Sequence, residues 1–206
     1  MRTFWKTVVA MGGMALFVGA VMTGCTSKSP QKTEKITLYI GGMTAEELEK
    51  ALDREKILVT PFARSMLRNE KEFVIPVNKR EQERGGKRAE TLHLVRLRVR
   101  DLGFTHYPTT TELFARAKEF GLDLCPPETG PYMRLAHKDQ PPGWYYIAME
   151  PVTDSLGNPD VFRLGRRGGG LWLCHVWAGP GRPWNLGARF VFGVRKPGLP
   201  AGRSDS

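Results

Sequence analysis

Three cysteines carry the most reactive side chains of this 206-residue chain: Cys25, Cys125 and Cys174. A cysteine thiol can be modified by attachment of another group, or it can form a disulfide with a second cysteine. Cys125 and Cys174 are a candidate disulfide, and two buried free thiols are the alternative. Cys25 directly follows a long uncharged stretch, which points to a different role.

Glu128, His137 and Asp139 could carry acid–base chemistry, because carboxylates and imidazole are the side chains that most often transfer protons in enzymes. The sequence does not fix their relative positions. The motifs G-x-S-x-G and H-E-x-x-H, which mark common hydrolase sites, do not occur in it. A hydrolase is therefore the second interpretation of the chain, and its catalytic residues stay unknown.

Metal binding has little support in the sequence. The four histidines are scattered, and none stands at the i, i+4 spacing of helical ligands. Asp154, Asn158 and Asp160 offer oxygen atoms in "DSLGNPD", but no distal glutamate follows them as in a calcium loop. We expect a hairpin turn at this place, no metal site and no cofactor.

Arginines and tryptophans in two stretches could bind an anionic ligand. In "VRLRVR", residues 95–100, strict alternation predicts a strand with its three arginines on one face, and a solvated sheet face is the alternative. "LWLCHVWAGPGRPWN" places two tryptophans and an arginine in or near Gly/Pro loops, where such side chains stack on sugars, hold anions or close the core. The candidate binding residues are Arg96, Arg98, Arg100, Trp177, Arg182 and Trp184.

The composition agrees with an anionic partner. The chain has 31 Lys and Arg against 21 Asp and Glu, a net charge of +10, and a pI near 9.8. Such an excess favours lipid headgroups, acidic polymers or nucleic acid without selecting one. The 41% hydrophobic and 25% charged residues are ordinary for a globular protein, and the length suits one domain.

The N-terminus has the layout of a secretory signal peptide. Arg2 and Lys6 precede "TVVAMGGMALFVGAVMTG", residues 7–24, which carries no charge and ends in small residues. Met22-Thr23-Gly24-Cys25 resembles the lipobox of bacterial lipoproteins. The resemblance implies cleavage after Gly24, lipid attachment to Cys25, and a protein held at the membrane of the cell envelope by its lipid anchor.

Two alternatives stay open for this segment: an uncleaved signal anchor, and an ordinary signal peptide that is removed. All three place the folded part outside the cytoplasm, which disfavours nucleic acid as a partner. Residues 25–38 are expected to form a polar tether, and residues 197–206 a disordered tail.

The elements between these ends predict an α+β fold. Thr44 with Glu47, and Thr109 with Glu112, have the spacing of capping boxes, and Thr60-Pro61 is typical of a third helix start. We expect two or three short helices, in part within residues 39–90, which end in a basic linker. "YMRLAHK", "WYYIAME", "VFRLGR", "LWLCHV" and "RFVFGVRK" are expected to form a small antiparallel sheet in a domain of residues 91–196.

Residues 92–196 resemble an uncharacterised bacterial domain family with the phrase L-G-L-x-L-C-P-x-E-x-G-P, followed by R-L, K-D-Q-P and I-A-M-E-P. Here the phrase reads "FGLDLCPPETGP". The resemblance implies a domain boundary and no activity, and Cys174 departs from the pattern of the family. The sequence thus favours a lipid-anchored, non-catalytic module that binds an anionic envelope polymer or an envelope protein, and an envelope hydrolase is the alternative.

Overall fold

The computed structural model describes residues 34–69, 73 and 90–195. The predicted signal peptide, Cys25, most of the tether and basic linker, and the tail lie outside these residues. Among the described residues, no helix has both the length and the apolar character needed to cross a membrane.

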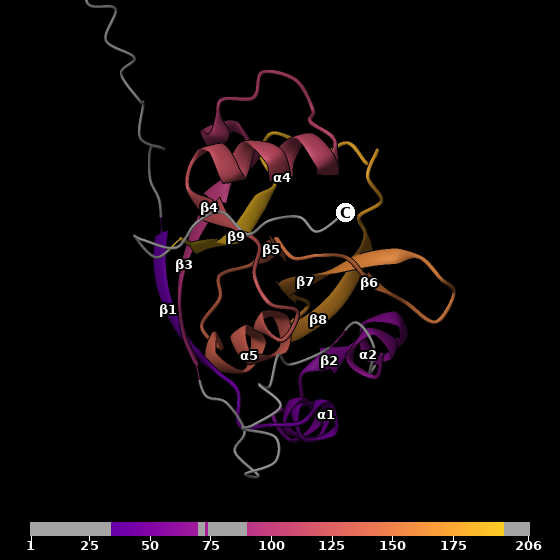
Figure 1. Ribbon diagram of the computed structural model, residues 1–206. Coiled ribbons are helices and arrows are strands. Elements are labelled where there is room, and N and C mark those ends of the chain that lie inside the picture. Colours follow the sequence, from indigo (N-terminus) through magenta and orange to yellow (C-terminus); the bar gives the residue numbers. More distant parts are fainter. Residues whose placement is uncertain (1–33, 70–72, 74–89, 196–206) are drawn as a thin grey trace, which may run out of the picture.

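A nine-stranded sheet organises the described part of the chain (Figure 1). Seven strands follow the order β1-β3-β9-β5-β7-β8-β2, while β4 pairs with β9 and β6 pairs with β7. The strands are β1 (Glu34–Ile40), β2 (Leu58–Val59), β3 (Glu90–Arg98), β4 (Leu122–Asp123), β5 (Gly143–Ile147), β6 (Val152–Thr153), β7 (Pro159–Arg167), β8 (Gly170–Trp177) and β9 (Arg189–Val194).

The α+β class is confirmed, but the prediction of a small, purely antiparallel sheet is wrong. β5 runs parallel to β9, and β2 runs parallel to β8. The reason is that β9 returns across the sheet to lie between β3 and β5, and β2 joins the far edge from the N-terminal segment. β1 also begins at Glu34, inside the range expected as a tether.

Four α-helices and one 3₁₀ helix accompany the sheet in the described residues: α1 (Ala45–Arg54), α2 (Pro61–Leu67), η1 (Val99–Leu102), α4 (Thr110–Glu119) and α5 (Thr129–Ala136). Both predicted capping boxes are present, because Thr44 and Thr109 each accept a hydrogen bond from the backbone N–H three residues on. The third start is confirmed too, with Pro61 as the first residue of α2.

Helix α5 lies where the sequence predicts a strand, so that prediction is wrong. The segment "YMRLAHK" was expected to be extended, yet residues up to Ala136 are helical. Pro131 lies in the first turn, where its missing N–H costs no hydrogen bond. Tyr132, Met133 and Arg134 are all buried, so the helix lacks the apolar–polar periodicity that marks a surface helix in a sequence.

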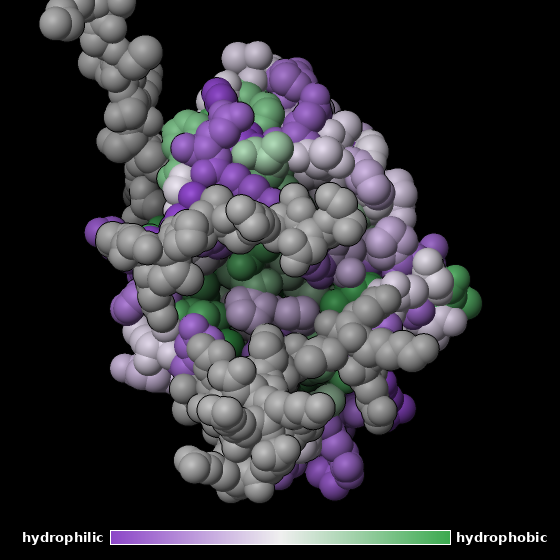
Figure 2. Space-filling model, viewed as in Figure 1, coloured by the Kyte–Doolittle hydropathy of each residue, from purple (hydrophilic) through white to green (hydrophobic). Residues whose placement is uncertain are grey.

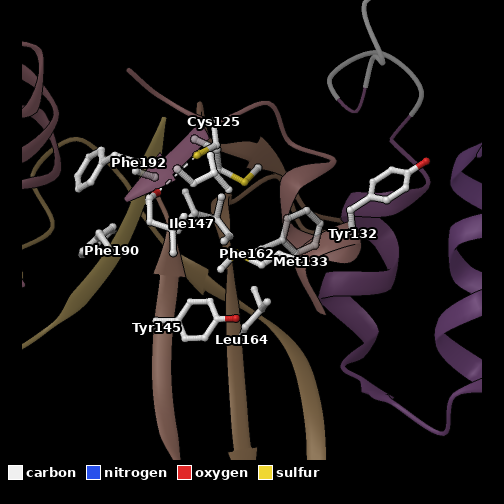
Figure 3. Packing of buried hydrophobic residues seen from close by; sticks show 14 of the residues in the cluster. Cys125, Tyr132, Met133, Tyr145, Ile147, Phe162, Leu164, Phe190 and Phe192 are labelled. Atoms are coloured by element: carbon white, nitrogen blue, oxygen red, sulfur yellow. Dashed lines mark hydrogen bonds between the residues drawn. The ribbon is translucent and has the colours of Figure 1, made fainter. Parts of the chain in front are cut away.

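The two faces of the sheet are covered differently. α5 and α2 lie on one face: Gly130 approaches the ring of Phe162 so closely that a Cβ would be 2.6 Å from it, and Phe62 meets His175 edge to face at 4.8 Å. Figure 3 shows this packing, with Met133 beside Phe162. On the opposite face, the indole N–H of Trp184 donates to Thr110 of α4.

Helix α4 covers only part of that second face. Leu113 and Ala117 of α4 are buried, and Trp184 packs edge-on against Phe190 and Tyr146. Figure 2 shows hydrophilic and apolar side chains side by side on the surface over α4. The part of this face on β7 and β8 carries the half-buried side chains described next.

Candidate functional site

Arg182 and Trp184 lie in the same loop but differ in burial. Trp184 is 2% exposed and belongs to the core, which is the alternative that the sequence left open for it. Its indole is closed in by Tyr146, Phe190 and the hydrogen bond to Thr110. The guanidinium of Arg182 lies 4.3 Å above the ring of Trp184 and stays half-buried.

Trp177 keeps the exposure that a binding residue needs, with 47% of its surface accessible. It is the last residue of β8 and faces Asp160 across the β7–β8 pair. Its indole lies over Gly179, where a Cβ would be 2.3 Å from the ring.

The three arginines of "VRLRVR" do not form a row on one strand. β3 ends at Arg98, and Arg100 lies in η1, because the Asp101 carboxylate accepts from the Arg98 N–H and the Arg100 N–H donates to Leu186. Arg96 forms an ion pair with Glu34. Arg98 and Arg100 remain exposed.

The proposed acid–base residues are not brought together. Glu128 precedes α5 and His137 follows it. The rise of the helix over these nine residues separates them by about 13 Å along the helix axis. Glu128 is buried, whereas Asp139 is exposed in the next loop. Burial lowers the pKa of His137, and Arg96 lowers it further. The geometry gives these residues no shared catalytic site.

Cys125 and Cys174 are both free and buried in the structure, so the candidate disulfide is not formed. Cys125 lies beside Met149, and its thiol contacts the Val191 carbonyl at 3.5 Å (Figure 3). Cys174 lies in β8, opposite Arg163 of β7. Burial raises the pKa of Cys125 to about 12, which makes its thiol unreactive at neutral pH.

Sequence reasoning missed the most distinctive contact on the second face of the sheet. Trp144 of β5 is paired with Gly165 of β7, and a Cβ on Gly165 would lie 2.1 Å from the indole. The ring therefore rests directly on the glycine backbone. The guanidinium of Arg163 covers the ring at 4.3 Å, so a cation–π contact holds Arg163 above the sheet.

Arg163 and Arg182 lie near each other on this face. Tyr146 is the cross-strand partner of Arg163, and its ring lies 5.0 Å from that of Trp184, which supports Arg182. We call Trp144, Tyr146, Arg163, Arg182 and Trp184 together the arginine face. Each of its two arginines rests on a tryptophan.

Neither arginine of the arginine face is paired with a carboxylate among the residues described. The Nε atom of each is buried without a hydrogen-bond partner there. Burial lowers the pKa of Arg182, and the positive charge of Arg163 lowers it further. Arginine nevertheless stays charged, so two guanidinium groups that repel each other lie on this face without a paired anion from the described residues.

Asp160 is the acidic residue whose charge acts on Arg182 without pairing with it. It is 1% exposed, and its Oδ2 has no hydrogen-bond partner among the described residues. Burial raises the pKa of Asp160 to about 6, Asp154 raises it further, and Arg182 opposes both.

A pocket of about 490 Å³ lies elsewhere, between α2 and the β6–β7 turn, with Arg64, Arg68 and Asp154 in its wall. Arg64 and Arg68 are ion-paired with Glu49. Asp154 accepts from the N–H groups of Leu156 and Asn158, which forms the predicted hairpin turn. The charges of this pocket are thus engaged within the protein.

The arginine face can therefore hold anions, but it offers no free aromatic ring for a sugar. Gly165 lies under Trp144 and Arg163 above it, while Trp184 is buried. The described residues contain no group of three or more His, Cys, Asp or Glu side chains that could hold a metal. No family model, curated protein or solved structure matches the chain.

Proposed function

We propose that the protein is a lipid-anchored, non-catalytic binding protein of the cell envelope, and that its arginine face binds an anionic polymer. The observation that carries the binding role is the pair of tryptophan-supported guanidinium groups at Arg163 and Arg182, which lack a paired carboxylate in the described structure. A phosphate or carboxylate group supplies the two parallel acceptors that a guanidinium prefers.

The lipid anchor is supported by the residues before the fold. Cys25 ends a lipobox-like sequence after an uncharged stretch, and the first strand begins at Glu34, a short distance further on. An anchor at Cys25 would keep the domain close to the membrane surface and to polymers attached there. Its test is the intact mass of the protein from membranes, which should begin at Cys25 and carry lipid that Cys25→Ala lacks.

The binding role predicts recognition by charge rather than by the sugar ring. Full-length protein in detergent should bind beads coated with a glycerol-phosphate polymer or with polygalacturonate, and should not bind neutral dextran beads. The bound fraction should fall as salt rises, because the contacts are ionic.

Arg163→Gln with Arg182→Gln should weaken binding to these beads by about tenfold or more, since each arginine would lose charge-assisted hydrogen bonds. Arg54→Gln with Lys118→Gln is the matched control. Both residues are exposed, and the double change removes the same charge outside the arginine face. Equal losses in the two double variants would mean that net charge alone explains binding, and the proposed site would be wrong.

A further inference from the structure

Arg134 of α5 is a fully buried arginine whose hydrogen bonds all go to neutral groups. Its exposure is 0%, and its two terminal nitrogens donate to the Gln140 side chain and to the carbonyls of Gly165 and His137. Its Nε has no hydrogen-bond partner among the described residues, and the exposed Asp139 attracts its charge without forming a salt bridge with it. A positive charge is thus buried without a carboxylate in direct contact, which is costly in a protein interior.

Tyr145 of β5 provides a second unpartnered donor in the same place. It is 2% exposed, and its hydroxyl has no hydrogen-bond partner among the described residues. Figure 3 shows this hydroxyl directed toward Leu164. Arg96 lies 4.9 Å above the ring, but its charge is balanced by Glu34.

The register of β5 and β7 places Tyr145 and Arg134 at neighbouring positions on one face of the sheet, within reach of each other's charge. Tyr145 is paired with Leu164, while Arg134 donates to the carbonyl of Gly165, the next residue of β7. The Gln140 side chain links Arg134 to β7, because it accepts a hydrogen bond from Arg134 and donates one to the Leu164 carbonyl. Arg134 lowers the pKa of Tyr145, although burial raises it more, to about 12, so the phenol stays protonated at neutral pH.

Two buried donors, one of them on a positive charge that no carboxylate contacts, share one requirement: an acceptor that carries negative charge. We propose that Arg134 Nε and Tyr145 Oη bind one small monovalent anion, of which chloride is the common case. A small ion suits this place because side chains and backbone carbonyls already occupy the other hydrogen-bonding positions of Arg134 and Gln140. A water molecule would accept the same hydrogen bonds but would leave the charge unbalanced.

The test is thermal unfolding of the full chain at constant ionic strength, with chloride replacing gluconate, a much larger anion. Binding to the folded state alone should raise the melting temperature by about 3 °C at 100 mM chloride, if the dissociation constant is about 10 mM. A melting temperature that is independent of chloride would overturn the proposal in favour of water.

Tyr145→Phe removes one donor and should abolish the chloride dependence. In gluconate this variant should be at least as stable as the wild type, because it no longer buries an unpartnered hydroxyl. Tyr39→Phe, at an exposed position of β1, should keep the full dependence. If Tyr145→Phe kept it, the assignment would be wrong.

This site is independent of the proposed function. Arg163→Gln should leave the chloride dependence of the melting temperature intact, because the open arginine face lies on the other side of the sheet. If Arg163→Gln abolished the dependence instead, chloride would be acting at the arginine face and the buried site would be disproved.

Discussion

Two pairs of arginines in this protein have opposite surroundings. Arg64 and Arg68 lie on or beside α2 and share Glu49, and Arg64 also pairs with Asp53. Arg163 and Arg182 lie on the sheet and in a loop, and each rests on a tryptophan. The first pair is neutralised within the fold, whereas the second pair is left with its charge.

The contrast shows why the number of arginines says little about binding. Burial opposes ionisation of Glu49, but hydrogen bonds from Arg68 and Arg64 outweigh it, so its pKa lies below the ordinary value. There the arginines hold α1 to α2. On the sheet, tryptophans fix the positions of the guanidinium groups without neutralising them, which leaves the charge for a ligand.

The largest expected effect comes from removing the shared carboxylate. Glu49→Gln should lower the free energy of unfolding by about 3 kcal/mol at pH 7, because Glu49 is almost buried and two arginines would keep only a neutral partner. Urea denaturation measures this loss. It should shrink as the pH falls through the lowered pKa of Glu49, since the wild-type carboxylate is then protonated too.

Glu46→Gln is the control for that change. Glu46 pairs with Lys50 on the exposed side of α1, and both side chains are open to solvent, so stability should hardly change. If Glu49→Gln behaved like Glu46→Gln, the paired arginines would not be structural and the comparison would fail.

An intermediate effect is expected at Gly165, which supports Trp144. Gly165→Ala should cost about 2 kcal/mol, because the new Cβ would displace the indole on which Arg163 rests. Tryptophan fluorescence and bead binding should change together with stability. Gly181→Ala, whose Cβ would meet no atom within 4 Å, should change none of the three, and equal behaviour of the two variants would refute the support by Trp144.

The smallest effect is expected at Asp160. Its pKa is raised to about 6, so folding favours the protonated form, and this contribution is complete below the ordinary pKa and lost as the pH rises through 6. Asp160→Asn should therefore stabilise the protein by about 1 kcal/mol or more at pH 7, and the raised pKa already includes the opposing attraction of Arg182. The difference should vanish near pH 4.

Asp139→Asn is the control for the loss of one negative charge at an exposed carboxyl, and its effect on stability should be small. A stability difference for Asp160→Asn that stayed constant from pH 4 to pH 7 would mean that Asp160 is not held near neutrality by the fold.

The sequence predicted the elements whose signals are local. The capping boxes of α1 and α4 use residues three positions apart, and "WYYIAME", "VFRLGR", "LWLCHV" and "RFVFGVRK" do contain strands. α5 was missed because its buried residues surround the helix. The parallel pairs were missed because each joins strands that are far apart in the chain.

Only part of the candidate site could be read in the same way. Arg182 was identified from its loop tryptophans, but Arg163 looked like any polar residue of a strand. Its distinction is the contact with Trp144 over Gly165, which depends on the register of β5 with β7. The absence of a paired carboxylate in the described residues is likewise a property of the fold.

The two outermost strands of the seven-strand path, β1 and β2, both come from the first part of the described chain. The strands between them come later, and the last, β9, ends at Val194. During synthesis the early residues thus have no complete sheet to join until almost the whole chain is present. For a protein that is exported as proposed, this order of assembly would delay folding and keep the chain extended for passage through the membrane.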